Sequence, residues 1–341
     1  MAIDLLKKLE QESIGKRINY NGNNYNNMYK SWIRNIKVIL TSKINGQQKI
    51  FENGINEFYI DINGSKYLAL NKDKGTLTIS NLPYDFLIEL ITFEYYIIEI
   101  FIGYGKDKEP ERYLKGEVSY ISQKVHTNHD VYTYITYAST YVARFSQSRI
   151  NFNLNSGINL YAAIKYISDI SGMGDNVKIS PSLKNYFTSQ VITNYAQAGT
   201  LIDQIAAMSN EYFELSTDES QDGFYIDCTK LSDKRRIIID PNIILIGKGN
   251  PTISSAGLKI TFLPMFNFKP GDIIKIPNSL IDASISDAED VTSTFNPNFI
   301  SPTGEYMIRE IKYHFQNRGQ TFELNITAIA INLLKNIAGS Q

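Results

Sequence analysis

Residues 36–82 read IKVILTSKINGQQKIFENGINEFYIDINGSKYLALNKDKGTLTISNL, and this stretch decides the fold. Asn-Gly occurs within it at 45–46, 53–54 and 63–64, after an earlier copy at 21–22. The dipeptide supports the positive φ angles of tight two-residue turns, and the runs between its copies are rich in strand-forming residues. The pattern predicts a series of antiparallel hairpins with a turn at each Asn-Gly.

The same texture continues toward residue 145, with strand-like runs at 75–82, 91–104, 112–125 and 130–143. The run 91–104, ITFEYYIIEIFIGY, contains two glutamates and is interpreted as one or two strands. We therefore predict a first antiparallel β-barrel domain over residues 28–149. Residues 1–27 lack a regular hydrophobic pattern, and we expect an N-terminal arm that is either mobile or ordered by a partner.

The pattern changes after Arg149. In GINLYAAIKYISDISG (157–172), apolar residues recur every four positions at Ile158, Ala162, Tyr166 and Ile170, and Leu160, Ile164 and Ile167 complete one apolar side. This pattern predicts an amphipathic helix that stops at Gly172. A second helix is predicted at 199–210, followed by two strands joined around Gln221-Asp222-Gly223. These elements indicate a small α+β insert domain over residues 150–235.

Strand periodicity then returns in RRIIID, NIILIG, LKITFLP, DIIKIP, EYMIREIKYHF and QTFELNITAIAI. We predict a second domain of antiparallel strands over residues 236–332 and a C-terminal tail over 333–341. The expected fold is mainly β, with two antiparallel strand domains separated by the α+β insert.

Composition excludes several classes of protein. The 341 residues contain 34 Lys+Arg and 35 Asp+Glu, so a net charge of -1 gives no general attraction to nucleic acid or to anionic membrane. One cysteine and three histidines rule out a disulfide framework within the chain and any multi-cysteine metal site. The N-terminus lacks a signal-peptide core, and no apolar run reaches membrane-spanning length. We therefore expect that the protein assembles inside a cell and does not insert into a membrane.

Three motifs could carry a ligand, and each has a simpler interpretation. His126, His129 and Asp130 join two predicted strands at a turn, with no further ligand evident nearby. Asp218 to Gly223 resembles half of a calcium loop, but Thr229 stands where a bidentate Glu is needed. Gly247 and Gly249 lack the remaining residues of a phosphate-binding loop. We interpret all three as loops or turns, and expect neither metal nor cofactor.

The sequence signals for catalytic groups are equally weak. The acidic residues Asp287, Glu289 and Asp290, like Glu109 and Glu111, are interpreted as solvated loops, although a hydrolase with an acidic pair is a distant alternative. Cys228 lies in a predicted strand far from any histidine and is interpreted as a structural thiol. Tyr132 and Tyr134 share one face of a predicted strand, opposite Thr133 and Ile135, where they either pack in the core or contact a sugar or another chain. We predict no catalytic residues and no enzyme.

The order of motifs from about residue 75 to 332 resembles the baseplate hub proteins of tailed bacteriophages and related contractile injection systems. The resemblance rests on five elements: Ile79-Ser-Asn81-Leu82, Ile102-Gly103-Tyr104, Leu114-Lys-Gly116-Glu-Val118, the Pro-Gly-Asp strand in FNFKPGDIIKIPNSL (266–280), and the final hairpin GEYMIREIKYHFQNRGQTFELNITAIA (304–330). The resemblance implies that the second strand domain, 236–332, is also an antiparallel β-barrel, and the α+β insert falls between the two barrels, as it does in that family.

The resemblance implies a structural protein of the virion tail baseplate, assembled in the host cytoplasm. Three copies would form a ring of six barrels that adapts the hexameric tail tube to a central trimeric spike, with the insert pointing toward the spike. Tube, spike, tape measure and other baseplate proteins are the implied partners. We expect the segments Gly103–Arg112 and Asp282–Phe299 to meet them. The alternative is a β-rich carbohydrate-binding or host-recognition module of a virion.

Overall fold

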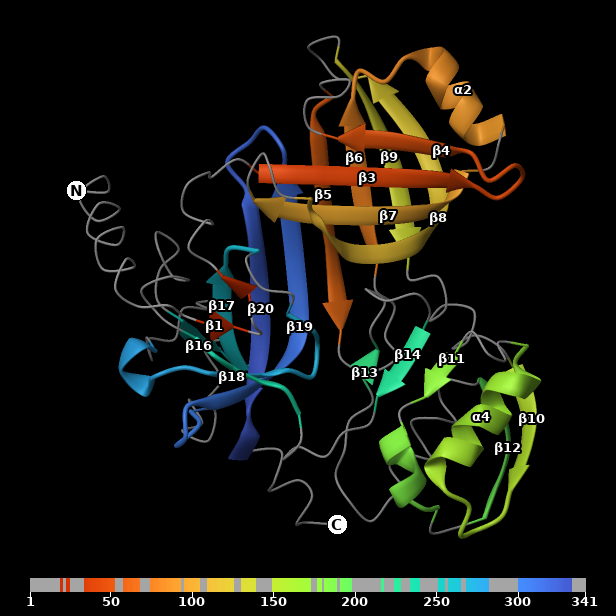
Figure 1. Ribbon diagram of the computed structural model, residues 1–341, viewed down its shortest axis with the longest axis vertical. Helices are drawn as coiled ribbons and strands as arrows, with labels where there is room; N and C mark the ends of the chain where they lie inside the picture. The colour runs from red at the N-terminus through yellow and green to blue at the C-terminus, as the bar shows by residue number, and fades with distance from the viewer. Residues whose placement is uncertain are drawn as a thin grey trace, which may run out of the picture.

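The computed structural model describes residues 19–20, 23–24, 34–52, 58–67, 74–92, 95–104, 109–125, 130–138, 149–172, 177–179, 181–188, 191–197, 216–217, 224–227, 234–239, 251–254, 257–264, 268–281 and 300–332. Strands dominate these residues, and most belong to one thirteen-stranded sheet (Figure 1). The predicted mainly β fold with a small α+β insert is confirmed.

The first strand region supplies seven strands of that sheet, in the order β4-β3-β7-β8-β9-β6-β5. Inward-facing residues alternate along these strands with exposed or half-buried ones, as in Val38 and Leu40, and form one hydrophobic core. Their bounds are β3 (Arg34–Ser42), β4 (Gln48–Glu52), β5 (Ile60–Tyr67), β6 (Lys74–Ser80), β7 (Tyr95–Tyr104), β8 (Glu111–Val125) and β9 (Val131–Ala138).

The second strand region continues the same sheet as β5-β19-β20-β17-β16, and β18 pairs with both β15 and β19. Its core residues, such as Phe262 and Ile326, belong to the same hydrophobic cluster as those of the first region. The elements are β15 (Arg236–Ile238), β16 (Thr252–Ser254), β17 (Gly257–Phe262), β18 (Ile273–Lys275), the 3-10 helix η4 (Asn278–Leu280), β19 (Glu305–Gln316) and β20 (Phe322–Ala330). The division into barrel domains at 28–149 and 236–332 stays a prediction, because the two regions share one sheet.

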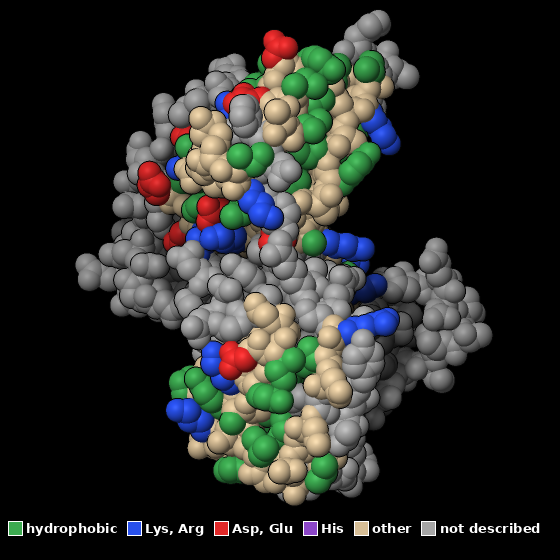
Figure 2. Space-filling view, turned by 90° about the vertical axis from the view of Figure 1, so that its right-hand side faces the viewer, with side chains coloured by type: hydrophobic (Ala, Val, Ile, Leu, Met, Phe, Trp, Pro, Cys, Tyr) green, Lys and Arg blue, Asp and Glu red, His purple; other side chains and the backbone are tan. Residues whose placement is uncertain are grey.

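The insert lies below the strand regions in Figure 1 and forms a separate lobe in Figure 2. Its strands pair in two small groups, β10 with β12 and β14 with β11 and β13. The predicted strand pair around residues 221–223 is thereby confirmed. The elements are β10 (Arg149–Leu154), α4 (Leu160–Ile170), β11 (Val177–Ile179), the 3-10 helix η3 (Pro181–Asn185), β12 (Ile192–Gln197), β13 (Ser216–Thr217) and β14 (Phe224–Asp227).

Helix α4 confirms the helix predicted within 157–172, and Asn159 caps its start by accepting a hydrogen bond from the Ala162 amide. The predicted apolar side is confirmed only in part. Leu160, Ala163, Ile164 and Ile167 are buried, whereas the line Ala162, Tyr166 and Ile170 is exposed. The two lines flank each other on the helix, and only one can face the lobe's interior. The second predicted helix, 199–210, lies outside the described residues.

Helix α2 (Tyr84–Thr92) occupies residues that we assigned in part to a strand, and that assignment was wrong. Its first turn begins at Pro83, whose carbonyl accepts bonds from the amides of Phe86 and Leu87. The segment is apolar nearly all round, so periodicity does not distinguish helix from strand there. A strand follows only from Tyr95, as β7.

The Asn-Gly turns have different outcomes. Asn45-Gly46 forms the predicted turn between β3 and β4, with Gly46 at φ +70°. The strands β1 (Asn19–Tyr20) and β2 (Asn23–Asn24) pair on either side of the first copy. The copy at 53–54 lies outside the described residues. Asn63-Gly64 is not a turn, because both residues lie inside β5.

Candidate functional site

A joint between β5 and β19 unites the two strand regions. Seven residue pairs connect the strands in antiparallel register, from Asp61 opposite Gln316 to Tyr67 opposite Glu310. On its other edge, β19 pairs with β20 in the C-terminal hairpin. The sheet is therefore continuous across partners that lie from 243 residues (Tyr67 and Glu310) to 255 residues (Asp61 and Gln316) apart in the sequence.

A row of two glycines between two tyrosines crosses this joint. Tyr313 of β19 opposes Gly64, Gly64 opposes Gly75, and Gly75 opposes Tyr137 of β9. A methyl group on Gly64 would lie 2.5 Å from Tyr313 Cζ, and one on Gly75 would lie 2.6 Å from Tyr137 Cζ. The tyrosine rings thus cover the glycines, and their hydroxyl groups meet at 3.1 Å. This packing is the physical reason why Asn63-Gly64 lies in a strand.

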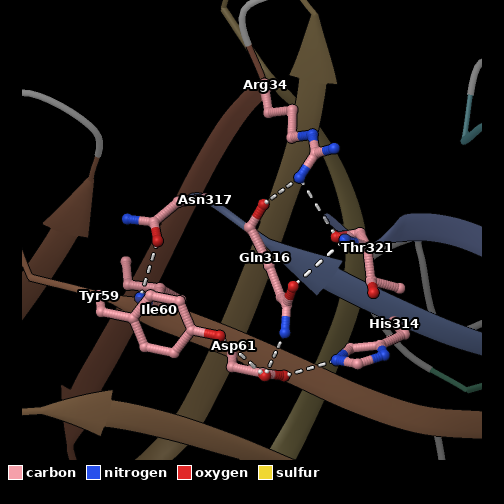
Figure 3. A network of polar contacts seen from close by, with 8 residues as sticks. All are labelled: Arg34, Tyr59, Ile60, Asp61, His314, Gln316, Asn317 and Thr321. Carbon is pink, nitrogen blue, oxygen red and sulfur yellow. Dashed lines mark hydrogen bonds and ion pairs between the residues drawn. The ribbon is translucent and has the colours of Figure 1, made fainter. Parts of the chain in front are cut away.

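A polar cluster centred on Asp61 lies at the end of the joint (Figure 3). Its carboxylate is 3.0 Å from His314 Nε2 and accepts hydrogen bonds from Gln316 Nε2 at 2.8 Å and from the Tyr59 hydroxyl at 3.2 Å. Burial, and secondarily the nearby carboxylate of Asp61, raises the pKa of Tyr59 to about 12. The cluster ties β5 to β19 through side chains as well as backbone.

The turn of the C-terminal hairpin is held by the first strand region. The Arg34 guanidinium donates to the carbonyl oxygens of Gly319 at 2.6 Å and of Gln316 and Gln320 at 3.2 Å each. Asn317 accepts from the Ile60 amide at 2.9 Å and donates to the Phe58 carbonyl at 2.7 Å. Figure 3 shows Arg34 on one side of the turn, and on the other side Asn317, a residue of the turn itself, pointing to Ile60. The hairpin is therefore an integral part of the first region's sheet.

On either side of this joint, a stretch of strand has one edge without a partner among the described strands. Residues 111–117 of β8 pair with β7, but residues 118–125 pair only with β9 among the described strands. That free stretch exposes Tyr120 and Val125, which are 64% and 74% accessible. At the opposite end, β17 pairs with the short β16 only at residues 257–259 among the strands that the structure describes. Eight strands, β8-β9-β6-β5-β19-β20-β17-β16, run between the two edges.

Comparison with known proteins identifies this arrangement. No protein-family model and no curated protein matches the sequence. Among solved structures, the tail protein from Neisseria meningitidis MC58 matches with a TM-score of 0.55 at 7% identity, covering 89% of this chain and 99% of that one. The 43 kDa tail protein of prophage MuSo2 from Shewanella oneidensis matches with a TM-score of 0.51 at 10% identity, covering 87% of this chain and 98% of that one. The chain has the fold of phage tail proteins.

A third structure widens this group. The E. coli c3393 protein, a type VI secretion component described as similar to the T4 bacteriophage tail proteins gp27 and gp5, matches with a TM-score of 0.50 at 12% identity. It covers 82% of this chain and 75% of its own length. The tail-protein fold thus confirms, for the fold, the resemblance to baseplate hub proteins that the sequence motifs indicated.

Two of the motifs behind that resemblance have clear roles in the tail-protein fold. Asn81 adopts a left-handed conformation at φ 54° and accepts a hydrogen bond from the Val131 amide at 3.0 Å, so it links the end of β6 to the start of β9. The Pro270-Gly271-Asp272 motif forms a turn in which the Asp272 amide donates to the Lys269 carbonyl. The Asp272 carboxylate accepts from Arg235, with an Nε–Oδ1 distance of 3.0 Å.

The final strand motif encodes a bulge. In Gly304-x-Tyr306-x-Ile308-x-x-Ile311, the last two apolar residues are three positions apart, whereas a regular strand repeats every two. The pairing of β19 with β20 shifts register between Ile308 and Glu310, which places an extra residue there. Tyr306, Ile308 and Ile311 are consequently all fully buried.

Most residues considered for chemistry lie outside the described residues: His126, His129, Asp218–Gly223, Cys228, Thr229, Gly247, Gly249, Asp287, Glu289 and Asp290. The segment Asp282–Phe299 also lies there. Of the rest, Asp130 accepts from the Asn81 side chain at 3.2 Å, and Glu109 and Glu111 are exposed. Within the described part of the chain, no three His, Cys, Asp or Glu side chains are placed to hold a metal, and no helix is long and apolar enough to cross a membrane.

Tyr132 and Tyr134 share one face of β9, as predicted, and the opposite face carries the fully buried Thr133 and Ile135. Both tyrosines are half-buried on the side away from the core. Lys124 Nζ lies 6.0 Å from the centre of the Tyr134 ring. Sequence reasoning missed the joint residues Arg34, Asp61 and His314, although the glycines at 64 and 75 marked their neighbourhood.

Proposed function

We propose that this chain is a baseplate hub protein, of which three copies form a ring between a hexameric tail tube and a trimeric spike. The observation that carries the proposal is the eight-stranded run through both strand regions, with a different open edge at each end. Open strand edges are templates for pairing with another chain.

Two different edges favour a ring over a two-fold dimer. A two-fold interface uses the same patch on both subunits, whereas pairing β8 of one copy with the β16–β17 edge of the next is head-to-tail and closes only after a full rotation. Each copy contributes two strand regions, so three copies give six around the ring, which matches a six-fold partner. The net charge of -1 keeps repulsion between identical copies small.

The partners follow from this role and from the relatives. Phage tail proteins and a type VI secretion component share the fold, which supports a place in the tail baseplate of a virion, assembled in the host cytoplasm. Tail tube, spike and tape measure proteins are the partners of such a ring. Nothing in this role requires catalysis, and we propose a purely structural protein.

Proline substitutions in the open stretch of β8 test the ring. Successive amides of a strand point to opposite edges, so of Ser122→Pro and Gln123→Pro one removes an amide facing β9 and the other an amide facing the open edge. We expect one variant to lose fold stability and the other to remain folded while losing trimer mass in light scattering. A wild-type monomer at high concentration that binds a glycan, and neither tube nor spike protein, contradicts the proposal and favours a host-recognition module.

A further inference from the structure

Helix α2 leaves a line of large apolar side chains in solvent. Tyr84, Ile88 and Ile91 are 67%, 43% and 53% exposed and lie at i, i+4 and i+7, on one side of the helix. The buried residues Leu87 and Leu90 occupy the neighbouring side. We call Tyr84, Ile88 and Ile91 the α2 stripe. Single exposed apolar residues are ordinary, but three aligned on one helix mark a binding surface.

The α2 stripe is held on a rigid support. The Phe86 ring packs edge-on against Phe51 of β4 with centroids 5.7 Å apart, and Lys49 Nζ lies 2.7 Å from Glu89 Oε1. The same lysine lies 4.7 Å from the centre of the Phe86 ring. These contacts fix the rotation of α2 about its axis, so the stripe is presented in one orientation. They also pair the charge of Glu89, which leaves Asp85 as the exposed acid in the first turn.

The position of α2 decides which partner the stripe can meet. In Figure 1 the helix lies at the upper end of the molecule and the insert at the lower end, while β5, β19 and β20 run roughly along the direction that joins the two ends. Strands pair sideways, so a ring closed by pairing has its axis roughly along the strands, with a tilt of about 40°. The stripe and the insert therefore lie at opposite axial ends of the ring. Helix α2 packs on β4, which pairs only with β3 among the described strands.

We propose that the α2 stripe is the surface on which the neighbouring protein ring, at the end away from the insert, docks. This inference rests on the proposed function, under which that ring is the tail tube. The partner surface that fits the α2 stripe is apolar and uncharged at its centre, and it carries a Lys or Arg opposite Asp85. Among the described residues of each chain, only α2 aligns three large exposed apolar side chains. The trimer therefore offers three stripes to six tube subunits, and every second tube subunit makes this contact.

Charge substitutions on the stripe test the docking. Ile88→Asp should leave the trimer intact and weaken its binding to tail tube protein from the same gene cluster more than tenfold, measured by co-sedimentation with assembled tube rings. Tyr166→Asp on α4, another exposed apolar side chain on a helix, is the matched control and should retain tube binding. A photo-crosslinking residue at Ile91 should form adducts with tube protein and none with spike protein.

The outcomes separate this inference from the hub role. An Ile88→Asp trimer that binds tube rings as tightly as the wild type overturns the docking surface and leaves the hub role intact. Loss of the trimer in a folded Ile88→Asp variant overturns it too, because the stripe then lies between copies of this chain. A wild-type chain that is monomeric at high concentration removes the hub role itself. Crosslinks from Ile91 to spike protein reverse the proposed polarity and overturn the inference.

Discussion

The covered edge of β5 and the open edge of β8 belong to the same sheet but are equipped differently. The β5 edge is filled by β19 over seven residue pairs and is tied by Arg34, Asp61 and the glycine–tyrosine row. The open stretch of β8 carries Tyr120, Lys124 and Val125, whose side chains are exposed to solvent. Lysine and short polar side chains protect an edge from unspecific pairing. The comparison indicates that the β5 edge is built for one permanent register, whereas the open stretch of β8 is the edge that we propose pairs with another copy.

Breaking the glycine–tyrosine row should have the largest effect. We expect Gly64→Ala to lower the free energy of unfolding by about 3 kcal/mol or more, because the added methyl group would meet both Tyr313 and the Lys74 carbonyl oxygen, 2.6 Å away. Urea unfolding monitored by circular dichroism measures the change. Gly46→Ala is the control: its φ of +70° is unfavourable for alanine, but no atom lies within 4 Å, so about 1 kcal/mol is expected. Equal losses in the two variants contradict close packing at the joint.

Removing the arginine that holds the hairpin turn should cost less. Arg34→Ala deletes several charged hydrogen bonds to carbonyl oxygens of residues 316–321, and we expect a loss of about 2 kcal/mol. Arg34→Lys keeps the charge without the planar fork and should be intermediate. Hydrogen exchange at the turn of the β19–β20 hairpin should accelerate in Arg34→Ala while exchange in α4 stays unchanged. Uniform acceleration in both places means that Arg34 has no local role at the hairpin.

The contact between the Tyr137 and Tyr313 hydroxyl groups should contribute less to stability than the packing over the glycines. Tyr137→Phe and Tyr313→Phe should each lower the free energy of unfolding by about 1 kcal/mol, since each removes one side of the 3.1 Å contact. The double variant should cost clearly less than the sum of the single ones, because both substitutions abolish the same hydrogen bond. Strict additivity in the double-mutant cycle shows that the two hydroxyl groups do not interact.

The open and covered edges also explain what the sequence could predict. Asn45-Gly46 and Asn63-Gly64 have the same local preference, yet only the first is a turn. The difference comes from Tyr313, which packs over Gly64 from 249 positions further along the chain, and no local pattern contains that information. The joint between β5 and β19 was missed for the same reason. The bulge in β19, by contrast, is visible in the sequence itself, because Ile308 and Ile311 are three positions apart instead of two.

The helices give the complementary case. Helix α4 could be predicted from its periodicity and the stop at Gly172, but its exposed line could not, because two adjacent apolar lines compete for one interior. Helix α2 was hidden by apolar residues on nearly every side. That same excess leaves Tyr84, Ile88 and Ile91 in solvent. The composition that obscured the helix is therefore the one that gives it a surface for a partner.

The smallest expected effect lies at the polar end of the joint and depends on pH. Burial, and then Asp61, raises the pKa of Tyr59 to about 12, above the value of about 10 in an unfolded chain. Below pH 10 the phenol is neutral in both states, and its contribution to stability is fully present. Between pH 10 and 12 the unfolded state loses this proton first, so stability falls as pH rises.

Tyr59→Phe should therefore flatten the decline of stability between pH 10 and 12, measured as the urea midpoint across that range. Some decline must persist, because burial also raises the pKa values of Tyr104, Tyr137 and Tyr306. Asp61→Asn should flatten the slope less than Tyr59→Phe, since burial is the larger cause of the shift. If Asp61→Asn flattens the slope as much as Tyr59→Phe does, the carboxylate dominates the phenol's titration, and the covered edge of β5 is held more by charge than by burial.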